Sequence, residues 1–452
     1  MTDTLPPELL ARYADARLPR YTSYPTAPNF SDEVGEANYR SWLAALPPGS
    51  ASLYVHIPFC RAMCWYCGCH TTVAARAAPV ARYLQSLIKE IELVARYVRG
   101  LRTISHLHFG GGTPTMMSPV QMRSLMDELR SRFAFESNAE VAIEIDPRTL
   151  SENMAQALGE CGFNRASLGV QSFDGRVQRA INRVQGFEQV REAMRLLREN
   201  GMRRTNFDLI YGLPNQTLQS CLETVAQAAA LRPDRLAVFG YAHVPAFKPH
   251  QRKIDEAALP DWDARFTHSR AIAGALVRAG YVEIGLDHFA LPDDPLAQAA
   301  AERRLHRNFQ GYTTDEAEVL IGLGASSIGR MPQGYVQNET RIPIYQRIVA
   351  EDRLPIARGY SFEGEDRLRA AVIERLMCDN RVDVGEVCRQ FNTDYEQLLQ
   401  NERLERLIAD GLVNRDGAEI TVRPHARPLV RSIAAAFDAH LAPAANGYSR
   451  AV

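Results

Sequence analysis

The sequence has little of what a disulfide-bonded, membrane-spanning or polyanion-binding protein needs. Only eight of its 452 residues are cysteine, too few for a disulfide framework in a chain of this length. No run of about 18 apolar residues occurs, so no segment is expected to span a bilayer, and the N-terminus lacks the pattern of a secretory signal. The formal net charge of −1 gives no electrostatic reason to expect nucleic acid or an anionic membrane as partner. We therefore expect a soluble, cytoplasmic protein.

The few cysteines are unevenly distributed, and their spacing indicates metal chemistry. Half of them lie in the segment Cys60-Arg-Ala-Met-Cys64-Trp-Tyr-Cys67-Gly-Cys69. The C-x3-C-x2-C spacing of Cys60, Cys64 and Cys67 brings three thiolates within reach of one small centre. A 4Fe–4S cubane has four irons, so three protein ligands leave one iron open, as catalytic metal sites do. The alternatives are buried free thiols or a zinc knuckle, which usually needs a second Cys or His pair that the other cysteines do not supply.

The first half of the chain alternates short, apolar, β-rich runs with helical patterns. Between the first two runs, for example, Tyr83, Leu87 and Ile91 follow helical spacing. Such alternation implies parallel strands with right-handed crossovers. Six units predict an α/β fold with a partial (β/α)6 TIM-like barrel, although doubly wound sheets share the pattern. The runs are Ser52–His56, Ile104–Gly110, Val141–Asp146, Arg165–Ser172, Asn206–Gly212 and Arg235–His243, and Val177–Asn200 is predicted as one helix.

Polar residues and glycines gather at the ends of these runs, where barrel enzymes place their chemistry. The cysteine segment follows the first run directly, and Gly110-Gly-Gly-Thr113 follows the second. Consecutive glycines let a ligand approach the backbone, although a tight turn would also explain them. Glu144 lies on the third run, and its carboxylate suits a ribose or a cationic sulfonium if that face lines the lumen rather than a solvated edge. Gln171 and Asp208 are candidates because their runs reach the same end.

The N-terminal segment Pro19-Arg-Tyr-Thr-Ser-Tyr-Pro-Thr26 resists helix formation. It could lie over the barrel mouth and offer Arg20 to a carboxylate, or it could be an ordered arm without a ligand. Cys69 is not needed by a cluster that three thiolates already hold. It is either a spare thiol or a group that approaches substrate.

Beyond residue 245 the strand–helix alternation stops. Trp262–Ala279 has an amphipathic helical pattern, whereas Arg307–Tyr312 and Gly322–Gly329 are predicted loops. From about Ser361, three helices, a hairpin and a final helix predict a small, mostly helical, winged-helix-like domain. This domain has no basic excess, so we expect a lid or packing module and not DNA binding. The predicted division is a substrate-covering arm (1–50), a core (51–245), a core extension (246–360) and a C-terminal domain (361–452).

Several segments together resemble the oxygen-independent coproporphyrinogen III oxidases (dehydrogenases) of the radical S-adenosylmethionine (SAM) superfamily. The likeness extends from Arg20 to about Leu441, nearly the whole chain. Related haem chaperones on the same scaffold generally lack Cys69 and the N-terminal segment. Two aromatic positions depart from the usual residues, Tyr66 for Phe and Phe109 for Trp, and both keep a ring. The matching segments are Arg20–Thr26, Tyr54–Cys60, Cys67–Cys69, Phe109–Thr115 and Arg307–Tyr312.

The resemblance implies a ligand set for each cofactor. It assigns one 4Fe–4S cluster to Cys60, Cys64 and Cys67, and it implies two SAM molecules. A first SAM would contact Tyr54, Tyr66, Gly111, Glu144 and Ile328; a second would lie near Gly112, Thr113, Gln171, Arg183, Asp208 and Ala242. Arg183 is a candidate on this ground alone. Arg20, Tyr21 and Cys69 are the candidates for substrate contacts.

The resemblance also implies the reaction. Two propionates of coproporphyrinogen III would be oxidatively decarboxylated to vinyl groups, giving protoporphyrinogen IX, by a 5′-deoxyadenosyl radical from SAM. No amino-acid general base is required, and the expected partner is an electron-donor protein such as a flavodoxin or ferredoxin. A monomer is the default for the family. The alternatives are a haem-binding chaperone without decarboxylase activity, a radical SAM enzyme with another substrate, and a ferredoxin-like electron carrier.

Overall fold

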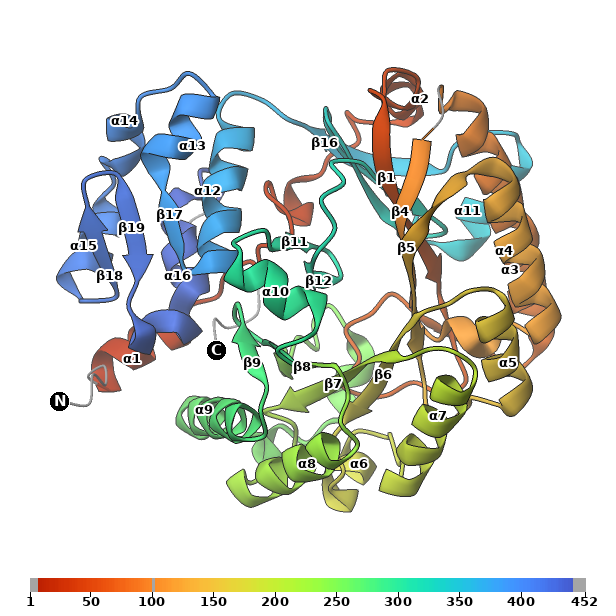
Figure 1. The fold of residues 1–452 in the computed structure, drawn as a ribbon, viewed down its shortest axis with the longest axis horizontal. Coiled ribbons are helices and arrows are strands. Elements are labelled where there is room, and N and C mark those ends of the chain that lie inside the picture. The colour runs from red at the N-terminus through yellow and green to blue at the C-terminus, as the bar shows by residue number, and fades with distance from the viewer. Residues whose placement is uncertain (1–6, 100–101, 442–452) are drawn as a thin grey trace.

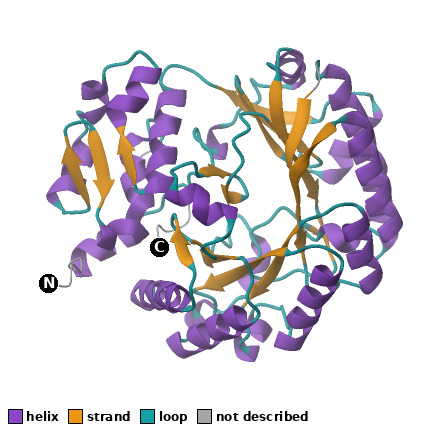
Figure 2. Ribbon diagram, in the orientation of Figure 1, coloured by secondary structure: helices purple, strands orange, loops and turns teal. Residues whose placement is uncertain are grey.

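A 12-stranded mixed sheet forms the centre of the computed structural model, which describes residues 7–99 and 102–441. Six strands pair in parallel and in chain order, and the curved sheet they form has helices on its outer face (Figures 1 and 2). This confirms the predicted partial (β/α)6 architecture. The six strands are β1 (Gly49–Ile57), β4 (Arg102–Gly111), β5 (Ala134–Ile145), β6 (Arg165–Gln171), β7 (Arg204–Tyr211) and β8 (Arg235–Gly240).

The outer helices pack through the apolar faces that their sequences predict. In α3 the predicted stripe is buried, with Leu87 and Ile91 at 0% exposure. The Ser118 side chain caps α4 by accepting a hydrogen bond from the Gln121 amide, which fixes where the helix begins. The helices are α3 (Ala77–Tyr97), α4 (Pro119–Arg132), α5 (Glu152–Glu160), α6 (Gly175–Ala180), α7 (Phe187–Glu199), α8 (Leu218–Ala230) and α9 (Trp262–Arg278).

The predicted single helix over Val177–Asn200 is wrong, because it is two helices, α6 and α7, joined by residues 181–186. Asn182 in this connection has a left-handed backbone, with φ of 54°, which no helix interior tolerates. Its side chain donates to the Met63 carbonyl at 2.8 Å, and the Trp65 amide donates to the Ile181 carbonyl at 2.9 Å. The residues between the two helices therefore hydrogen-bond to the cysteine segment and help to hold it in place.

Two segments predicted as loops are strands. Residues of the Arg307–Tyr312 segment form a small hairpin, and the Gly322–Gly329 segment contributes to the main sheet, where β13 pairs in parallel with β1. Both were missed because short glycine-containing strands lack a measurable alternation. The strands are β11 (His306–Asn308), β12 (Gly311–Thr313), β13 (Leu320–Leu323), β14 (Ile328–Met331), β15 (Gly334–Asn338) and β16 (Ile356–Ser361), with β9 (Val282–Ile284) and β10 (His288–Ala290) at the opposite edge of the sheet.

The C-terminal region has its own apolar core, and the N-terminal arm takes part in it. Leu18, Tyr21 and Tyr24 pack with C-terminal residues such as Phe437. Figure 1 shows this unit as a separate lobe beside the barrel. The third of the helices predicted in this domain is two short helices, Tyr395–Leu399 and Glu402–Ala409, because Asn401 caps a new one. The elements are α12 (Asp366–Asp379), β17 (Arg381–Asp383), α13 (Val384–Gln390), α14 (Tyr395–Leu399), α15 (Glu402–Ala409), β18 (Val413–Asp416), β19 (Glu419–Val422) and α16 (Val430–Ala434).

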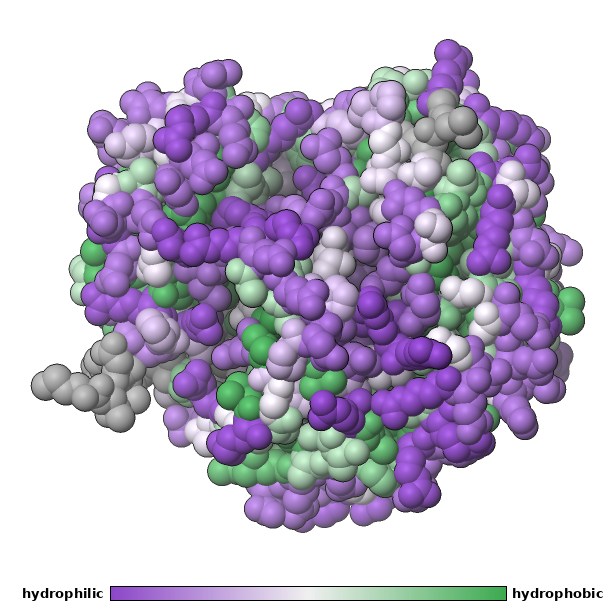
Figure 3. All heavy atoms as spheres, in the orientation of Figure 1, coloured by the Kyte–Doolittle hydropathy of each residue, from purple (hydrophilic) through white to green (hydrophobic). Residues whose placement is uncertain are grey.

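The remaining elements are short or lie at the periphery. Among the residues that the structure describes, no helix is both long and apolar enough to cross a membrane. The face shown in Figure 3 is mostly hydrophilic, with scattered apolar residues. These elements are α1 (Pro7–Ala14), α2 (Glu36–Ala44), β2 (Phe59–Cys60), β3 (Thr72–Val73), α10 (Pro295–Ala301) and α11 (Ile342–Ala350).

Candidate active site

A cavity of about 720 Å³, here called the central cavity, lies at the C-terminal ends of the parallel strands. It collects most of the side chains that the sequence singled out, although they come from positions 20 to 242. A second cavity of about 490 Å³ shares some of its walls and is lined by Tyr54 and Ile328. The predicted residues on the central cavity are Arg20, Cys60, Cys64, Tyr66, Cys67, Cys69, Gly111, Gly112, Thr113, Glu144, Gln171, Arg183, Asp208 and Ala242.

The three spaced thiols lie on one loop, and each has a distinct polar neighbour. The Thr71 hydroxyl donates to Cys60 Sγ at 3.3 Å. Two guanidiniums approach Cys64 Sγ, Arg148 at 3.6 Å and Arg183 at 3.5 Å. The Cys69 thiol hydrogen-bonds to Cys67 and lowers the pKa of Cys67 to about 7. Positive charge and hydrogen-bond donors beside sulfur stabilise the thiolate that a cluster requires.

This donor set fits an iron–sulfur cubane. All three thiols face the central cavity, and no described cysteine is in a disulfide. Among the described residues, no three His, Cys, Asp or Glu side chains are close enough together to share one metal ion. A cubane binds each thiolate at a different iron, so its ligands surround a larger volume than the ligands of a single ion do.

A second loop holds the cysteine segment in place. Gln251 is 1% exposed and donates to the Tyr66 carbonyl at 3.1 Å, while its own carbonyl accepts from the Val244 amide at 2.6 Å. His250 Nε2 lies 2.7 Å from the Cys67 carbonyl, and Lys248 donates to the Cys69 carbonyl at 3.1 Å. Backbone carbonyls of the cysteine segment are thus bound from outside, which leaves its sulfurs directed to the cavity.

The glycine run after β4 is required by close packing. A Cβ at Gly112 would lie 2.6 Å from the Thr71 hydroxyl oxygen, and a Cβ at Gly111, where φ is 113°, would lie 2.7 Å from the His56 ring. No other residue fits at either position. Burial lowers the pKa of His56 to about 4, so its ring is neutral. The ring links two groups by hydrogen bonds: its Nδ1 lies 2.9 Å from the Tyr54 hydroxyl, and its Nε2 lies 2.9 Å from the His70 carbonyl.

Two carboxylates face the cavity from neighbouring parts of the sheet. Glu144 accepts a hydrogen bond from the Gly111 amide at 3.1 Å and lies 3.4 Å from His108 Nε2. Asp208 accepts from Nδ2 of the Asn206 side chain at 2.9 Å and from the Ser167 hydroxyl at 3.2 Å. Burial, together with the nearby charge of Glu144, raises the pKa of Asp208 to about 6. Two neighbouring acids with no Arg or Lys ion pair among the described residues are suited to a cationic or hydroxyl-rich ligand.

An ion cluster at the end of β5 lines the same cavity. Arg148 binds Asp146 through two nitrogens, at 2.9 and 2.6 Å, and Arg183 approaches the same carboxylate at 3.4 Å. Gln171 lies beside them with a left-handed φ of 66°, and its buried side-chain oxygen has no hydrogen-bond partner among the described residues. A buried acceptor without a partner at a cavity wall is expected to accept a hydrogen bond from a ligand.

Comparison with known proteins identifies the family. Residues 54–228 match the model of the radical SAM superfamily, and residues 362–429 match the HemN C-terminal domain. The oxygen-independent coproporphyrinogen III oxidase of Bradyrhizobium diazoefficiens is 54% identical over 98% of this chain and 99% of its own length. The chain belongs to the oxygen-independent coproporphyrinogen III oxidase family. The Escherichia coli relative of the same name is 41% identical over 94% of this chain and 93% of its own.

A solved structure of this family has the same fold. Coproporphyrinogen III oxidase (HemN) from Escherichia coli, described as a radical SAM enzyme, superimposes with a TM-score of 0.90. It is 41% identical and covers 93% of this chain and 98% of its own. The resemblance inferred from the cysteine, glycine and N-terminal segments is therefore confirmed, and it includes both matched regions, 54–228 and 362–429.

One residue predicted to contact substrate lies away from the cavity walls. Tyr21 is 4% exposed, and its hydroxyl donates to Asp438 at 2.9 Å in the C-terminal core. Conversely, Arg148, which reaches both Asp146 and Cys64, was not predicted from the sequence. The signal was present in Asp146-Pro-Arg148, a turn sequence directly after a strand that ends at the barrel mouth. His250 and Gln251 gave no such signal, because only the fold brings them to the cysteine segment.

Proposed function

We propose that this protein decarboxylates two propionates of coproporphyrinogen III oxidatively to vinyl groups without oxygen, giving protoporphyrinogen IX. The observation that carries the proposal is one cavity that gathers three spaced thiols, a glycine run and two carboxylates in a chain of this family. In each decarboxylation, a –CH2–CH2–COO⁻ group becomes –CH=CH2 and releases CO2, one hydrogen atom and one electron. Polar chemistry cannot readily do this, because no electron sink is adjacent to the carboxylate.

The cofactors would be one 4Fe–4S cluster and SAM, with two SAM molecules as the family resemblance implies. Cys60, Cys64 and Cys67 would hold the cluster through three irons. When bound, the reduced cluster and SAM supply a carbon-centred radical that can remove a hydrogen atom from an unactivated carbon. The first SAM would contact Tyr54, Tyr66, Gly111, Glu144 and Ile328; the second would contact Gly112, Thr113, Gln171, Arg183, Asp208 and Ala242.

The chain's own residues have binding and orienting roles. Glu144 and the Gly111 backbone offer an acceptor and close approach to a cationic ligand. Arg20 reaches the central cavity from the arm and can pair with a substrate carboxylate. Leu18 and Thr22 of the same arm line the cavity too, so the arm (1–50) would cover the substrate and exclude water. No side chain is required as a general base.

The partners follow from the same proposal. One electron per radical must come from an electron-donor protein such as a flavodoxin or ferredoxin, and the enzyme would act as a monomer. Free thiols and an oxygen-sensitive cluster suit the reducing cytoplasm. The alternative is a haem-binding chaperone, which would bind a tetrapyrrole without decarboxylating it.

An anaerobic assay with reconstituted protein, SAM, a reductant and coproporphyrinogen III separates the two. We expect divinyl product and 5′-deoxyadenosine to accumulate together. Abundant 5′-deoxyadenosine without any vinyl product would contradict the proposed substrate. Haem binding with neither product would favour the chaperone.

A further inference from the structure

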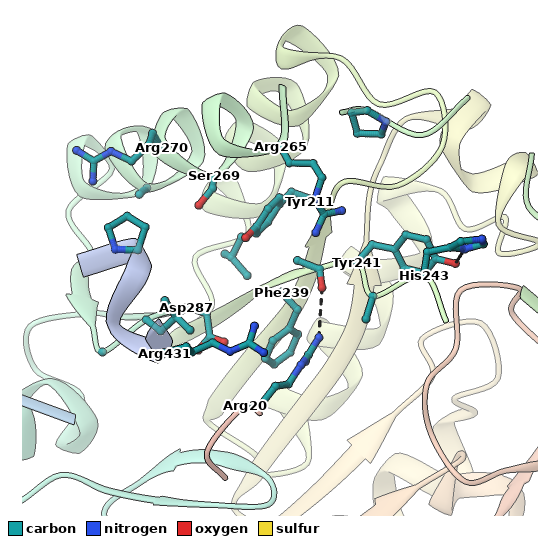
Figure 4. Close-up of a pocket in the computed structure, with 18 of the residues that line it drawn as sticks. Arg20, Tyr211, Phe239, Tyr241, His243, Arg265, Ser269, Arg270, Asp287 and Arg431 are labelled. Carbon is teal, nitrogen blue, oxygen red and sulfur yellow. Dashed lines mark hydrogen bonds between the residues drawn. The ribbon is translucent and has the colours of Figure 1, made fainter. Parts of the chain in front are cut away.

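A third cavity, of about 530 Å³, lies beside the central cavity, where α9, the end of β8, the N-terminal arm and the C-terminal lobe meet (Figure 4). Its walls are rich in one kind of side chain, so we call it the arginine cavity. It is lined by Arg17, Arg20, Arg265, Arg270, Arg307, Arg427 and Arg431. These seven guanidiniums come from four separate parts of the chain. Only the folded protein brings them together.

The carboxylates in these walls do not balance the guanidiniums. The described lining residues include three acids, and each has its own partner. Glu256 lies 3.0 Å from His243, Glu283 lies 3.9 Å from Arg427, and Asp287 lies 2.7 Å from His288. Seven cations against three anions leave a formal excess of four positive charges. Such an excess in a concave, partly enclosed site attracts anions.

Two of the arginines are held away from solvent at this site. Arg431 is 5% exposed and donates to the carbonyls of Leu18 and Pro19. Burial, with the nearby Arg20 and Arg307, lowers the pKa of Arg431 to about 9. Arg307 lies 4.4 Å above the Tyr312 ring, and its buried Nε and Nη1 have no hydrogen-bond partner among the described residues. Burying the charge of Arg431 and leaving the Arg307 nitrogens without acceptors both cost folding free energy, and a bound anion would offset this cost.

The backbone leaves room for a third guanidinium. Arg265 reaches from α9 to the ends of β7 and β8, beside Tyr211 and Tyr241 (Figure 4). A Cβ at Gly212, where φ is 79°, would overlap this guanidinium, and a Cβ at Gly240 would lie 3.2 Å from it. The two glycines thus let Arg265 lie against the strand ends. The site is formed by backbone as well as by side chains.

The arginine cavity adjoins the central cavity and shares part of its wall. Arg20, Phe239 and Arg307 line both, as does the backbone of residues 240–242. A tetrapyrrole carries its four propionates around its rim. When one propionate enters the central cavity, the propionates on the far side must point elsewhere, and four charged groups cannot be left in an apolar wall.

We propose that the arginine cavity binds the carboxylates of the tetrapyrrole that are not reacting. This inference rests on the proposed function and extends it by assigning the remote carboxylates a site. Two propionates survive the reaction, so the same cavity can hold substrate, intermediate and product. The recognised chemistry is a macrocycle with several carboxylates. A lone small anion lacks the ring that spans the two cavities.

Binding of coproporphyrin III, the stable oxidised form with the same four propionates, tests the proposal in the reconstituted holoenzyme by fluorescence quenching. The variants are Arg265→Gln and the more exposed Arg270→Gln. Arg278→Gln, at the end of the same helix and outside the cavity, is the matched control. We expect roughly tenfold weaker binding for each cavity variant, because a charge-assisted hydrogen bond is lost, and unchanged binding for the control. The tetramethyl ester, which has the ring without charges, should bind wild type and variants equally weakly.

Several results would overturn this assignment. Equal affinities for the acid and the ester would show that carboxylates are not recognised. Displacement of the porphyrin by millimolar inorganic phosphate would identify a site for free anions instead. If Arg265→Gln fails to fold, as judged by circular dichroism and iron content, Arg270→Gln and the ester comparison decide the question.

Turnover keeps this test separate from the proposed function. If wild type forms vinyl product while the cavity variants keep the KM of the control, the site assignment fails and the function stands. A raised KM with unchanged uncoupled SAM cleavage supports the assignment. If wild type binds the porphyrin tightly through these arginines but makes no vinyl product, the proposed reaction fails and the binding site stands.

Discussion

At the scale of single residues, the cysteine loop is asymmetric. Cys60 has hydroxyl neighbours, Cys64 has two guanidiniums, and Cys67 has another thiol. Cys64 is also the most buried of the three, at 8% exposure. A negative ligand held between Arg148 and Arg183 should be the hardest of the three to replace, because its loss leaves both cations without their sulfur partner.

Replacing this ligand should remove the cluster. We expect Cys64→Ser, reconstituted anaerobically, to lose the visible absorption of a 4Fe–4S centre and at least about 100-fold of its SAM cleavage, since two thiolates hold a cubane poorly. Cys161→Ser, a buried thiol at the end of α5, is the matched control and should keep full iron content. A Cys64→Ser protein with the iron content of the control would refute the ligand assignment.

Asp208 should make the fold less stable as pH rises. The pKa of its carboxyl is about 6 in the folded protein against 3.8 in the unfolded chain, so between about pH 4 and 6 the folded state holds a proton that the unfolded state has released. Folding stability from this group therefore falls over that window and then levels, by up to about 3 kcal/mol. The Asp208→Asn side chain does not titrate and so lacks this pH-dependent loss of stability. Its melting temperature should therefore rise relative to that of wild type from pH 4 to 6.

The measurement is thermal unfolding of the metal-free protein by circular dichroism across pH 4 to 8. Asp127→Asn, at an exposed carboxylate on α4, is the control. A constant difference between Asp208→Asn and wild type at every pH would contradict the linkage. The Asn variant should also bind SAM more weakly. Asp208 would then be a residue that lowers folding stability but is kept for ligand binding.

The site residues that belong to sequence motifs could be predicted. Those that only the folded chain brings to the site could not. Cys60, Gly112 and Glu144 stand beside strands whose ends could be located from periodicity alone. Arg148 was missed because an arginine after a turn is common on surfaces, and its contact with Cys64 spans 84 positions. Tyr21 was assigned to substrate by resemblance, whereas its buried hydroxyl bonds to Asp438. Contacts between residues that are far apart in the chain leave no local pattern in the sequence.

At the scale of elements, the six parallel strands were predictable because each is an apolar, β-rich run that recurs between helical patterns. The strands β11 to β14 were not, since they are only three or four residues long. The break between α6 and α7 was hidden for another reason. The apolar residues on both sides keep helical spacing, and only the contacts of Asn182 with the cysteine segment require the interruption.

The loop that carries Gln251 should determine how long the cluster is retained. Gln251→Ala removes hydrogen bonds to Tyr66, Ala242 and Val244 at once. We expect the reconstituted variant to lose iron to a chelator roughly tenfold faster than wild type, as outer partners of metal ligands typically affect affinity by that order. Gln219→Ala, an exposed glutamine on α8, should match wild type. Equal rates for all three proteins would show that this loop does not support the cluster.

At the scale of the whole molecule, two apolar cores meet around charged walls. The barrel core extends from Val34 to Leu354, and the C-terminal core includes the arm residues Leu18, Tyr21 and Tyr24. The arm therefore belongs to both lobes, since it packs in the C-terminal core as far as Tyr24 and in the barrel core from Val34. Its Arg20 lies on the shared wall of two cavities. A ligand that binds this wall must act on the junction of the lobes.

Substrate binding should consequently protect the arm and its partner from hydrogen exchange. With coproporphyrin III bound to the anaerobic holoenzyme, we expect amides of residues 17–25 and 427–438 to exchange roughly tenfold more slowly, because ligand binding stabilises the closed junction. The control segment is α13–α14 (Val384–Leu399), at the upper left in Figure 1, which contributes no residue to the walls of the three cavities and where rates should not change. Slowing confined to the cysteine segment would mean that the tetrapyrrole contacts the barrel alone. Uniform slowing of the C-terminal lobe, its control segment included, would mean general stabilisation and not a ligand held at the junction.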